Sequence, residues 1–237
     1  MSLNPLQVYE GKLADGDLKL DPVQADAVRA LDGLYHSLIK EANTPKKSFF
    51  QRLTSRAEEE PSIKGIYMYG GVGRGKSMLM DLFHDCLPDT IKARRVHFHE
   101  FMIEVHDYIN SRSRMREGPK GIVDQALPSL AGLIARQSRV LCFDEFHVVD
   151  ITDAMILGRL FKILFEHDVV VVATSNWAPD DLYKDGLQRD RFLPFIKLLK
   201  SRVEAVHLQH KRGVPLDTPA WRRGTSFSWR FPAHMHF

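Results

Sequence analysis

Hydrophobic and polar positions follow two kinds of pattern along the middle of the chain, one typical of strands and one typical of helices. Short apolar runs predict buried strands at residues 66–69, 140–144 and 169–174, and a further strand is predicted at 95–98. Four consecutive valines at 169–172 are typical of a strand covered on both faces. Helical spacing of apolar residues predicts helices at about 76–87, 100–110, 127–136, from Asp153 onward, and 194–200. This alternation predicts a parallel, doubly wound α/β sheet.

The N-terminal part of the chain has a different pattern. Asp21 and Pro22 have the form of a helix N-cap followed by proline at the first helical position, and apolar residues then recur at helical spacing to about Lys40. Residues 43–61 are polar and predict a connector. We therefore expect three parts: a helical attachment with its connector at 1–61, an α/β core at 62–208, and a tail at 209–237.

Composition limits the class of protein. Hydrophobic residues make up 44% and charged residues 27%, as in ordinary globular proteins, and no apolar run approaches the ~20 residues that span a bilayer. The first residues lack the pattern of a secretory or mitochondrial leader, so we expect a cytoplasmic protein. Neither Cys86 nor Cys142 belongs to a CxxC pair, and both are expected to be buried thiols in a reducing compartment.

Charge is distributed unevenly. The net charge is +3, but residues 209–237 hold five Lys and Arg and one acid, which leaves 28 basic and 29 acidic residues in 1–208. Residues 1–208 therefore lack the positive electrostatic field that indicates nucleic-acid binding. No specific nucleic-acid partner is expected. The basic run at 112–116 lacks interleaved aromatic residues and is interpreted as a solvated loop.

The most informative segment lies between the predicted strand at 66–69 and the predicted helix at 76–87. It has the pattern G-x-x-x-x-G-K-S, and the residues expected to contact a nucleotide are Gly70, Gly71, Val72, Gly73, Arg74, Gly75, Lys76, Ser77 and Met78. Glycines let backbone N–H groups surround a phosphate chain, and the helix N-terminus adds positive charge. Lys76 is expected to meet the β- and γ-phosphates of ATP, and the Ser77 hydroxyl to bind Mg²⁺. A glycine-rich turn is the alternative, but the strand and helix around it favour nucleotide binding.

Polar residues end two of the predicted strands. Asp144 and Glu145 follow the apolar residues 140–143, and ligands of open α/β sheets bind at that edge. Asp144 is expected to hold Mg²⁺, directly or through water, and Glu145 to deprotonate an attacking water. Asn176 follows the next strand and is the candidate for holding that water. The alternatives are acids that cap a strand and an ordinary turn asparagine.

Two arginines and three histidines complete the candidates. Arg189 and Arg191 are interpreted as an arginine finger that reaches the γ-phosphate of a neighbouring subunit, with a solvated helix start as the alternative. His97, His99 and His106 lack a cysteine or a second cluster that would complete a zinc site. We expect these histidines to have packing or hydrogen-bonding roles.

Together these motifs resemble those of one family. Residues 66–81, 95–102, 141–146, 153–161, 173–176 and 186–196 resemble segments of the ZapE-type AAA+ ATPases, which comprise the bacterial cell-division ATPase and its mitochondrial relatives. The resemblance covers the chain from about Pro5 to about Leu208. It implies a P-loop fold of the AAA+ type, with Asn176 as the sensor-1 residue and Arg189 or Arg191 as the finger.

The resemblance also implies an ATP-driven machine that assembles as a ring-type homo-oligomer and acts on protein substrates. In bacterial members the partner would be the division apparatus around FtsZ, and in mitochondrial members inner-membrane and respiratory-chain proteins. Peripheral association with a membrane is compatible with either. The missing leader pattern favours the bacterial setting.

After about Leu208 the chain departs from the family pattern, which continues into a helical lid. Residues 209–237 hold two of the three tryptophans and three prolines without helical periodicity, so we expect an unstructured tail, no recognisable lid and impaired turnover. Two functions remain: an ATP-hydrolysing enzyme that remodels proteins, and a nucleotide-dependent binding switch or inactive truncated product. A GTPase is disfavoured because no N-K-x-D segment occurs, and a small-molecule kinase because Asp144, Glu145 and Asn176 suit activation of water.

Overall fold

The computed structural model describes residues 3–44, 63–114 and 122–209. The strands are β1 (Gly65–Tyr69), β2 (Ala93–His97), β3 (Val140–Asp144), β4 (Val170–Ser175) and β5 (Val203–His207). The helices are α1 (Pro5–Ala14), α2 (Pro22–Asn43), α4 (Lys76–Cys86), α5 (Phe98–Arg114), α6 (Ile122–Gln137), α7 (Ile151–Glu166) and α8 (Leu193–Arg202), with 3-10 turns η1 (Pro179–Asp181) and η2 (Arg189–Arg191). The expectations for the tail after residue 209, and for most of the connector at 43–61, lie outside the described residues.

The described strands form one parallel sheet in the order β2-β3-β4-β1-β5. Strand β1 lies inside the sheet, where Ile66 is opposite Val172 of β4 and Gly65 is opposite Val203 of β5. The loop after β1 therefore emerges beside the end of β4. This arrangement confirms the predicted parallel α/β sheet.

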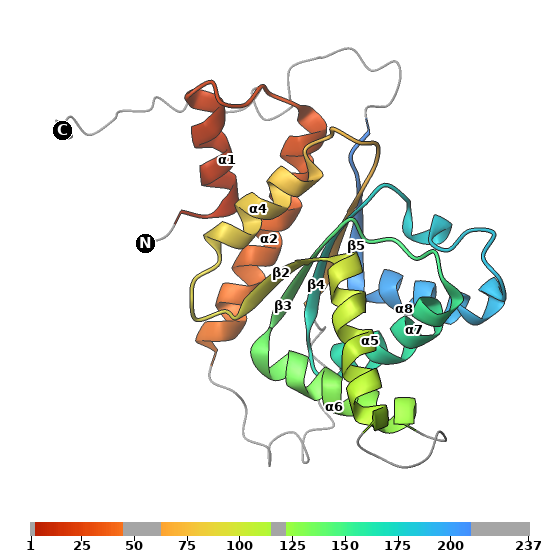
Figure 1. Ribbon diagram of the computed structural model, residues 1–237. Coiled ribbons are helices and arrows are strands. Elements are labelled where there is room, and N and C mark those ends of the chain that lie inside the picture. The colour runs from red at the N-terminus through yellow and green to blue at the C-terminus, as the bar shows by residue number, and fades with distance from the viewer. Residues whose placement is uncertain (1–2, 45–62, 115–121, 210–237) are drawn as a thin grey trace, which may run out of the picture.

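Helices cover both faces of the sheet (Figure 1). Helices α1, α2 and α4 pack on one face, over strand residues such as Val172 and Cys142. Helices α5, α6, α7 and α8 pack on the other, over residues such as Val171 and Phe143. Because successive residues of a strand point to opposite faces, a strand covered on both sides needs a continuous apolar run. That requirement explains the apolar runs at 140–143 and 170–173.

The two N-terminal helices share a core with the sheet. Tyr9 of α1 and Leu31 of α2 are buried in the same apolar cluster as Ile66 of β1. Helix α2 begins as predicted, because the Asp21 carboxylate accepts a hydrogen bond from Val23 N at 2.9 Å. Helix α1 is not predicted as a separate helix. It has a capping box in which the Asn4 and Gln7 side chains each accept the other residue's backbone N–H, at 2.9 and 3.1 Å.

Two further differences from the predicted elements concern α7 and β5. Helix α7 begins at Ile151, two residues before the predicted start, because the Asp150 carboxylate caps it. Strand β5 is not predicted, since it is a short edge strand with mostly exposed residues.

Cys86 and Cys142 are free and buried, as predicted, and burial raises the pKa of Cys142 to about 12. None of the described helices is both long and apolar enough to cross a membrane.

Candidate functional site

The glycine-rich segment forms the loop between β1 and α4, as predicted. Gly75 is the N-cap of α4 and has a φ of 81°, a left-handed conformation that favours glycine. Gly70 has a φ of 148°, and a Cβ at this position would lie 2.7 Å from the Leu208 carbonyl oxygen. Glycine is therefore required where the loop begins and where the helix begins. The N-terminus of α4 points its free N–H groups toward the loop, which is the arrangement that binds phosphates.

Lys76 joins the two ends of the site through its ammonium group. Its ammonium donates to the carbonyl oxygens of Gly70 and Gly71, both at 2.8 Å, and to Asn176 Oδ1 at 3.1 Å. Burial lowers the pKa of Lys76 from its ordinary value, while the negative charge of Glu145 opposes that shift. The structure thus brings three predicted site residues together: Lys76 on α4, Asn176 after β4 and Glu145 after β3.

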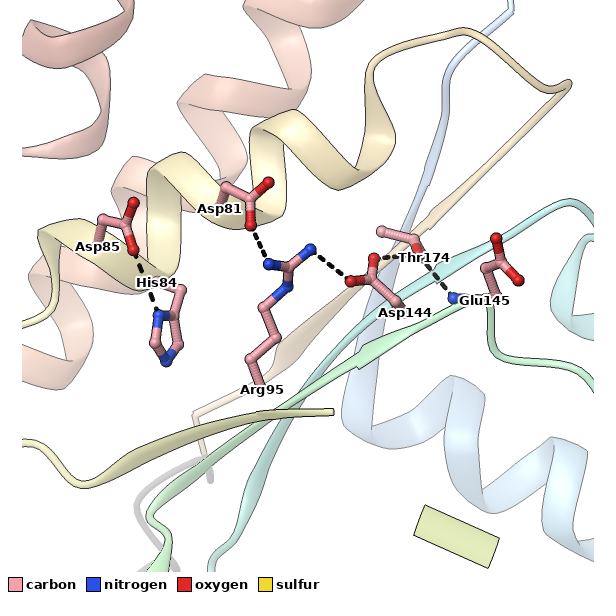
Figure 2. Close-up of polar contacts among 7 residues, drawn as sticks. All are labelled: Asp81, His84, Asp85, Arg95, Asp144, Glu145 and Thr174. Atoms are coloured by element: carbon pink, nitrogen blue, oxygen red, sulfur yellow. Dashed lines mark hydrogen bonds and ion pairs between the residues drawn. The ribbon is translucent and has the colours of Figure 1, made fainter. Parts of the chain in front are cut away.

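Thr174 of β4 contacts both acidic residues at the end of β3, through the Asp144 carboxylate and the Glu145 backbone N–H (Figure 2). Its hydroxyl donates to Asp144 Oδ1 at 3.2 Å and accepts a hydrogen bond from the Glu145 backbone N–H at 3.0 Å. The Asp144 side chain is only 3% exposed, whereas Glu145 is exposed. Glu145 also has a φ of 54°, uncommon for a residue with a side chain. The chain therefore turns sharply here, burying one carboxylate and presenting the other.

Arg95 of β2 contacts the other oxygen of Asp144. Its Nη2 donates to Asp144 Oδ2 at 2.5 Å, and its Nη1 pairs with Asp81 of α4. Figure 2 shows the guanidinium between the two carboxylates, while His84 and Asp85 pair separately farther along α4. Both oxygens of Asp144 thus have a hydrogen-bond partner.

The residues present fit the magnesium ion that the phosphate loop implies. Mg²⁺ is usually held by one or two protein oxygens together with phosphates and waters, so it needs no cage of side chains. Ser77 is exposed at the start of α4, and each Asp144 oxygen keeps a second lone pair beside its hydrogen bond. Ser77 and Asp144 would hold the ion. Within the described ranges, no group of three or more His, Cys, Asp or Glu side chains could hold a metal by itself.

A pocket of about 230 Å³ lies beside the two carboxylates. It is lined by His97, Phe98, His99, Glu100, Asp144, Glu145 and His147. Of the three histidines considered from sequence, His97 and His99 line this pocket, and His106 Nε2 lies 2.6 Å from Asp153 Oδ1. His106 therefore has the hydrogen-bonding role that was expected.

The two candidate finger arginines lie in η2 and differ in their surroundings. The Arg189 guanidinium donates to the Asp180 carbonyl oxygen at 2.5 Å. Arg191, two residues later, is exposed. Arg189 is thus held within its own chain, while Arg191 is presented at the surface.

Comparison with known proteins decides the family. A model of the AFG1-like ATPases matches residues 3–220, which is most of the chain and extends beyond Leu208. The chain belongs to the AFG1-like ATPase family. This confirms the resemblance found in the sequence motifs.

Individual relatives agree with this assignment. The cell division protein ZapE of Escherichia coli strain K12 is 40% identical over 216 residues, covering 87% of this chain and 55% of ZapE. An uncharacterized protein of Schizosaccharomyces pombe is 38% identical over 255 residues, covering 97% of this chain and 54% of the relative. The chain therefore spans about half the length of these curated relatives. The crystal structure of the DnaC helicase loader has a TM-score of 0.52 at 12% identity, covering 81% of this chain and 93% of that one, and shows the fold alone.

Three residues of this AFG1-like ATPase join the site without having been predicted: Asp81, Arg95 and Thr174. Thr174 stands two residues before Asn176, and Arg95 opens one of the segments that resemble the family. A charged residue at the start of a predicted strand was the available signal for Arg95. Its partners come from α4 and β3 and depend on the order of the strands, which the sequence pattern does not give.

The Thr174 hydroxyl is expected to stabilise the strand ends. Thr174→Val keeps the shape of the side chain but leaves Asp144 Oδ1 and the Glu145 N–H without this partner, so the free energy of unfolding should fall by about 1–3 kcal/mol. Thr174→Ser keeps the hydroxyl and is the matched control. Urea denaturation of both variants measures the difference. Equal stability of the valine and serine variants would show that the hydroxyl does not hold these groups.

Proposed function

We propose that this chain binds ATP together with Mg²⁺ and hydrolyses it to ADP and phosphate. The observation that carries the proposal is the 3.1 Å contact between Lys76 Nζ and Asn176 Oδ1, which joins the phosphate loop to the polar strand ends. Lys76 then supplies a cation for the phosphates, and it lies near the exposed Glu145 carboxylate and the Asn176 amide. This is the set of groups that phosphoryl transfer to water requires.

Each residue has a distinct part in the proposed reaction. Backbone N–H groups of residues 70–78 surround the phosphates, and Lys76 turns from the loop carbonyls to the β- and γ-phosphates. Ser77 and Asp144 would hold the Mg²⁺, which would supply positive charge to the phosphates. Glu145 takes a proton from water as the water oxygen bonds to the γ-phosphorus and the bond to the ADP oxygen breaks. Asn176 holds the water against the γ-phosphate.

The proposed enzyme works as a ring-type homo-oligomer. Val72, Val149 and Trp177 follow β1, β3 and β4 and are 87%, 77% and 47% exposed. Carboxyl ends of parallel strands meet at one edge of a sheet, so the loops that carry these apolar side chains lie at the edge that carries the proposed nucleotide site. Exposed apolar side chains at one edge are a feature of protein–protein surfaces. They support contact between this edge and a second subunit.

Arg191, rather than Arg189, is the proposed finger, because Arg189 is held by Asp180 in its own chain. Arg191→Ala and Lys76→Ala proteins should each be inactive alone. Mixed, they should release phosphate several-fold faster than the sum of the separate proteins, because an intact phosphate loop then meets an intact Arg191 from a neighbour. Arg189→Ala, mixed with Lys76→Ala in the same way, is the comparison. If size-exclusion chromatography shows co-assembly and hydrolysis is still not restored, Arg191 does not act between subunits.

Hydrolysis is proposed to drive the remodelling of protein partners. The Escherichia coli relative is named a cell division protein, which makes the division apparatus around FtsZ the first partner to test. We propose a cytoplasmic setting in a bacterium, with peripheral association at a membrane compatible with this role. No specific nucleic-acid partner is proposed, because the first 208 residues carry 28 basic and 29 acidic side chains.

A further inference from the structure

Arg95 joins the two elements that carry the proposed magnesium ligands (Figure 2). From β2 it reaches Asp144 Oδ2 through Nη2 at 2.5 Å and pairs with Asp81 of α4 through Nη1. Asp81 lies four residues after Ser77, so both are on the same side of α4. The guanidinium is therefore between the helix side that carries Ser77 and the strand that ends in Asp144.

Asp144 requires a positive charge close by. Its side chain is 3% exposed, and a carboxylate removed from water is strongly destabilised unless it is paired. Arg95 pairs with one carboxylate oxygen, and the Thr174 hydroxyl donates to the other at 3.2 Å. One fixed donor on each oxygen sets the plane of the carboxylate.

Asp81 makes the charge of the site more negative. Its side chain is 45% exposed and that of Arg95 is 33% exposed, so solvent ions can reach this side of the cluster. Without the guanidinium, two carboxylates would remain on either side of its position. Carboxylate oxygens are the ligands that hard divalent cations prefer. Arg95 occupies the place where such a cation would otherwise be attracted.

We propose that Arg95 is a positioning residue of the magnesium site, which supplies the positive charge beside Asp144 when no metal is bound and keeps its carboxylate in one orientation. This role rests on the proposed function, in which Asp144 is the magnesium carboxylate. Its consequence is an order of binding. The nucleotide-free chain repels divalent cations at this site, and the metal enters with the phosphates of the nucleotide.

The test uses Mn²⁺ alone as a probe of the nucleotide-free chain, with binding followed by electron paramagnetic resonance. In the Arg95→Met protein the two carboxylates lose their cation and its repulsion of a divalent ion, so Mn²⁺ should bind at least about 10-fold more tightly than to the unmodified chain. Arg95→Lys keeps the positive charge and should exclude the metal as the unmodified chain does. Arg95→Gln is neutral and keeps a donor for Asp144. The Arg95→Gln protein should show the same gain in Mn²⁺ affinity. It takes the place of Arg95→Met in the test if Arg95→Met does not fold.

Arg94→Met is the matched control. Arg94 precedes Arg95 on β2, its side chain is 32% exposed, and it pairs with Glu104 of α5 instead. The same proteins are compared for turnover and for binding of an ATP analogue in EDTA. Arg95→Met should lower kcat by about 10- to 100-fold, while its metal-free affinity for the analogue stays close to that of the unmodified chain.

If the unmodified chain hydrolyses ATP, the gain of Mn²⁺ binding and the loss of turnover are both required. Turnover lost without a gain in Mn²⁺ binding would mean that Arg95 serves the fold only, and it would overturn the proposal. So would a gain in Mn²⁺ binding with unchanged kcat, or equal changes in Arg94→Met. Absence of ATP hydrolysis by the unmodified chain would instead refute the proposed function, while the Mn²⁺ comparison would stand by itself.

Discussion

Replacing Lys76 with alanine is expected to weaken ATP binding by about 30- to 5,000-fold. Loss of one partner from a buried charge pair costs about 2–5 kcal/mol, and each factor of ten in affinity corresponds to about 1.4 kcal/mol. Lys76 is 9% exposed and already lies within 2.8 Å of two carbonyl oxygens of the phosphate loop. The phosphates would therefore lose the positive charge that lies against the loop carbonyls.

Titration of a fluorescent ATP analogue measures this effect. Lys64→Ala is the matched control, because Lys64 carries the same charge, is exposed, and precedes the opposite end of β1. It should bind the analogue with nearly unchanged affinity. Equal affinities of the two variants would remove Lys76 from phosphate binding.

Glu145→Gln is expected to preserve ATP binding and to slow hydrolysis by about 10²- to 10⁴-fold, the usual contribution of a general base. The amide keeps the shape of the side chain but cannot accept the proton of the attacking water. The backbone N–H of Glu145 is held by Thr174 Oγ1 at 3.0 Å, so the turn that presents the side chain should survive the substitution. The effect should therefore appear in the chemical step.

Single-turnover cleavage of labelled ATP, measured with binding of the same nucleotide, separates the two effects. Glu166→Gln makes the same chemical change at the exposed end of α7 and should leave both quantities unchanged. A Glu145→Gln rate within about threefold of the unmodified chain, far less than a general base contributes, would exclude Glu145 from that role.

Central strands and the phosphate loop could be predicted because their causes are local. A strand buried on both faces needs a continuous apolar run, as at 170–173 of β4, and a loop that surrounds phosphates needs glycine where φ is positive, as at Gly75. Asp144 and Glu145 could be predicted because they end such a strand. Each of these features depends on a few neighbouring residues.

What could not be predicted depends on contacts between distant segments. The ion pairs of Arg95 join residues 14 and 49 positions apart in the chain, and they exist because β2 lies beside β3 and α4 covers them. Strand β5 forms along β1 although only Val203 among its residues is buried. Arg189 and Arg191 are alike in sequence, and only the contact of Arg189 with the Asp180 carbonyl distinguishes them.

The most direct test of the proposed ATPase is steady-state phosphate release by the purified chain with ATP and Mg²⁺, with the Glu145→Gln protein as the blank. We expect phosphate release that is linear with time and depends on Mg²⁺. Its rate should exceed that of the blank by about 10²-fold or more. Nucleotide binding without release above the blank would contradict hydrolysis and would identify the chain as a nucleotide-dependent binding switch.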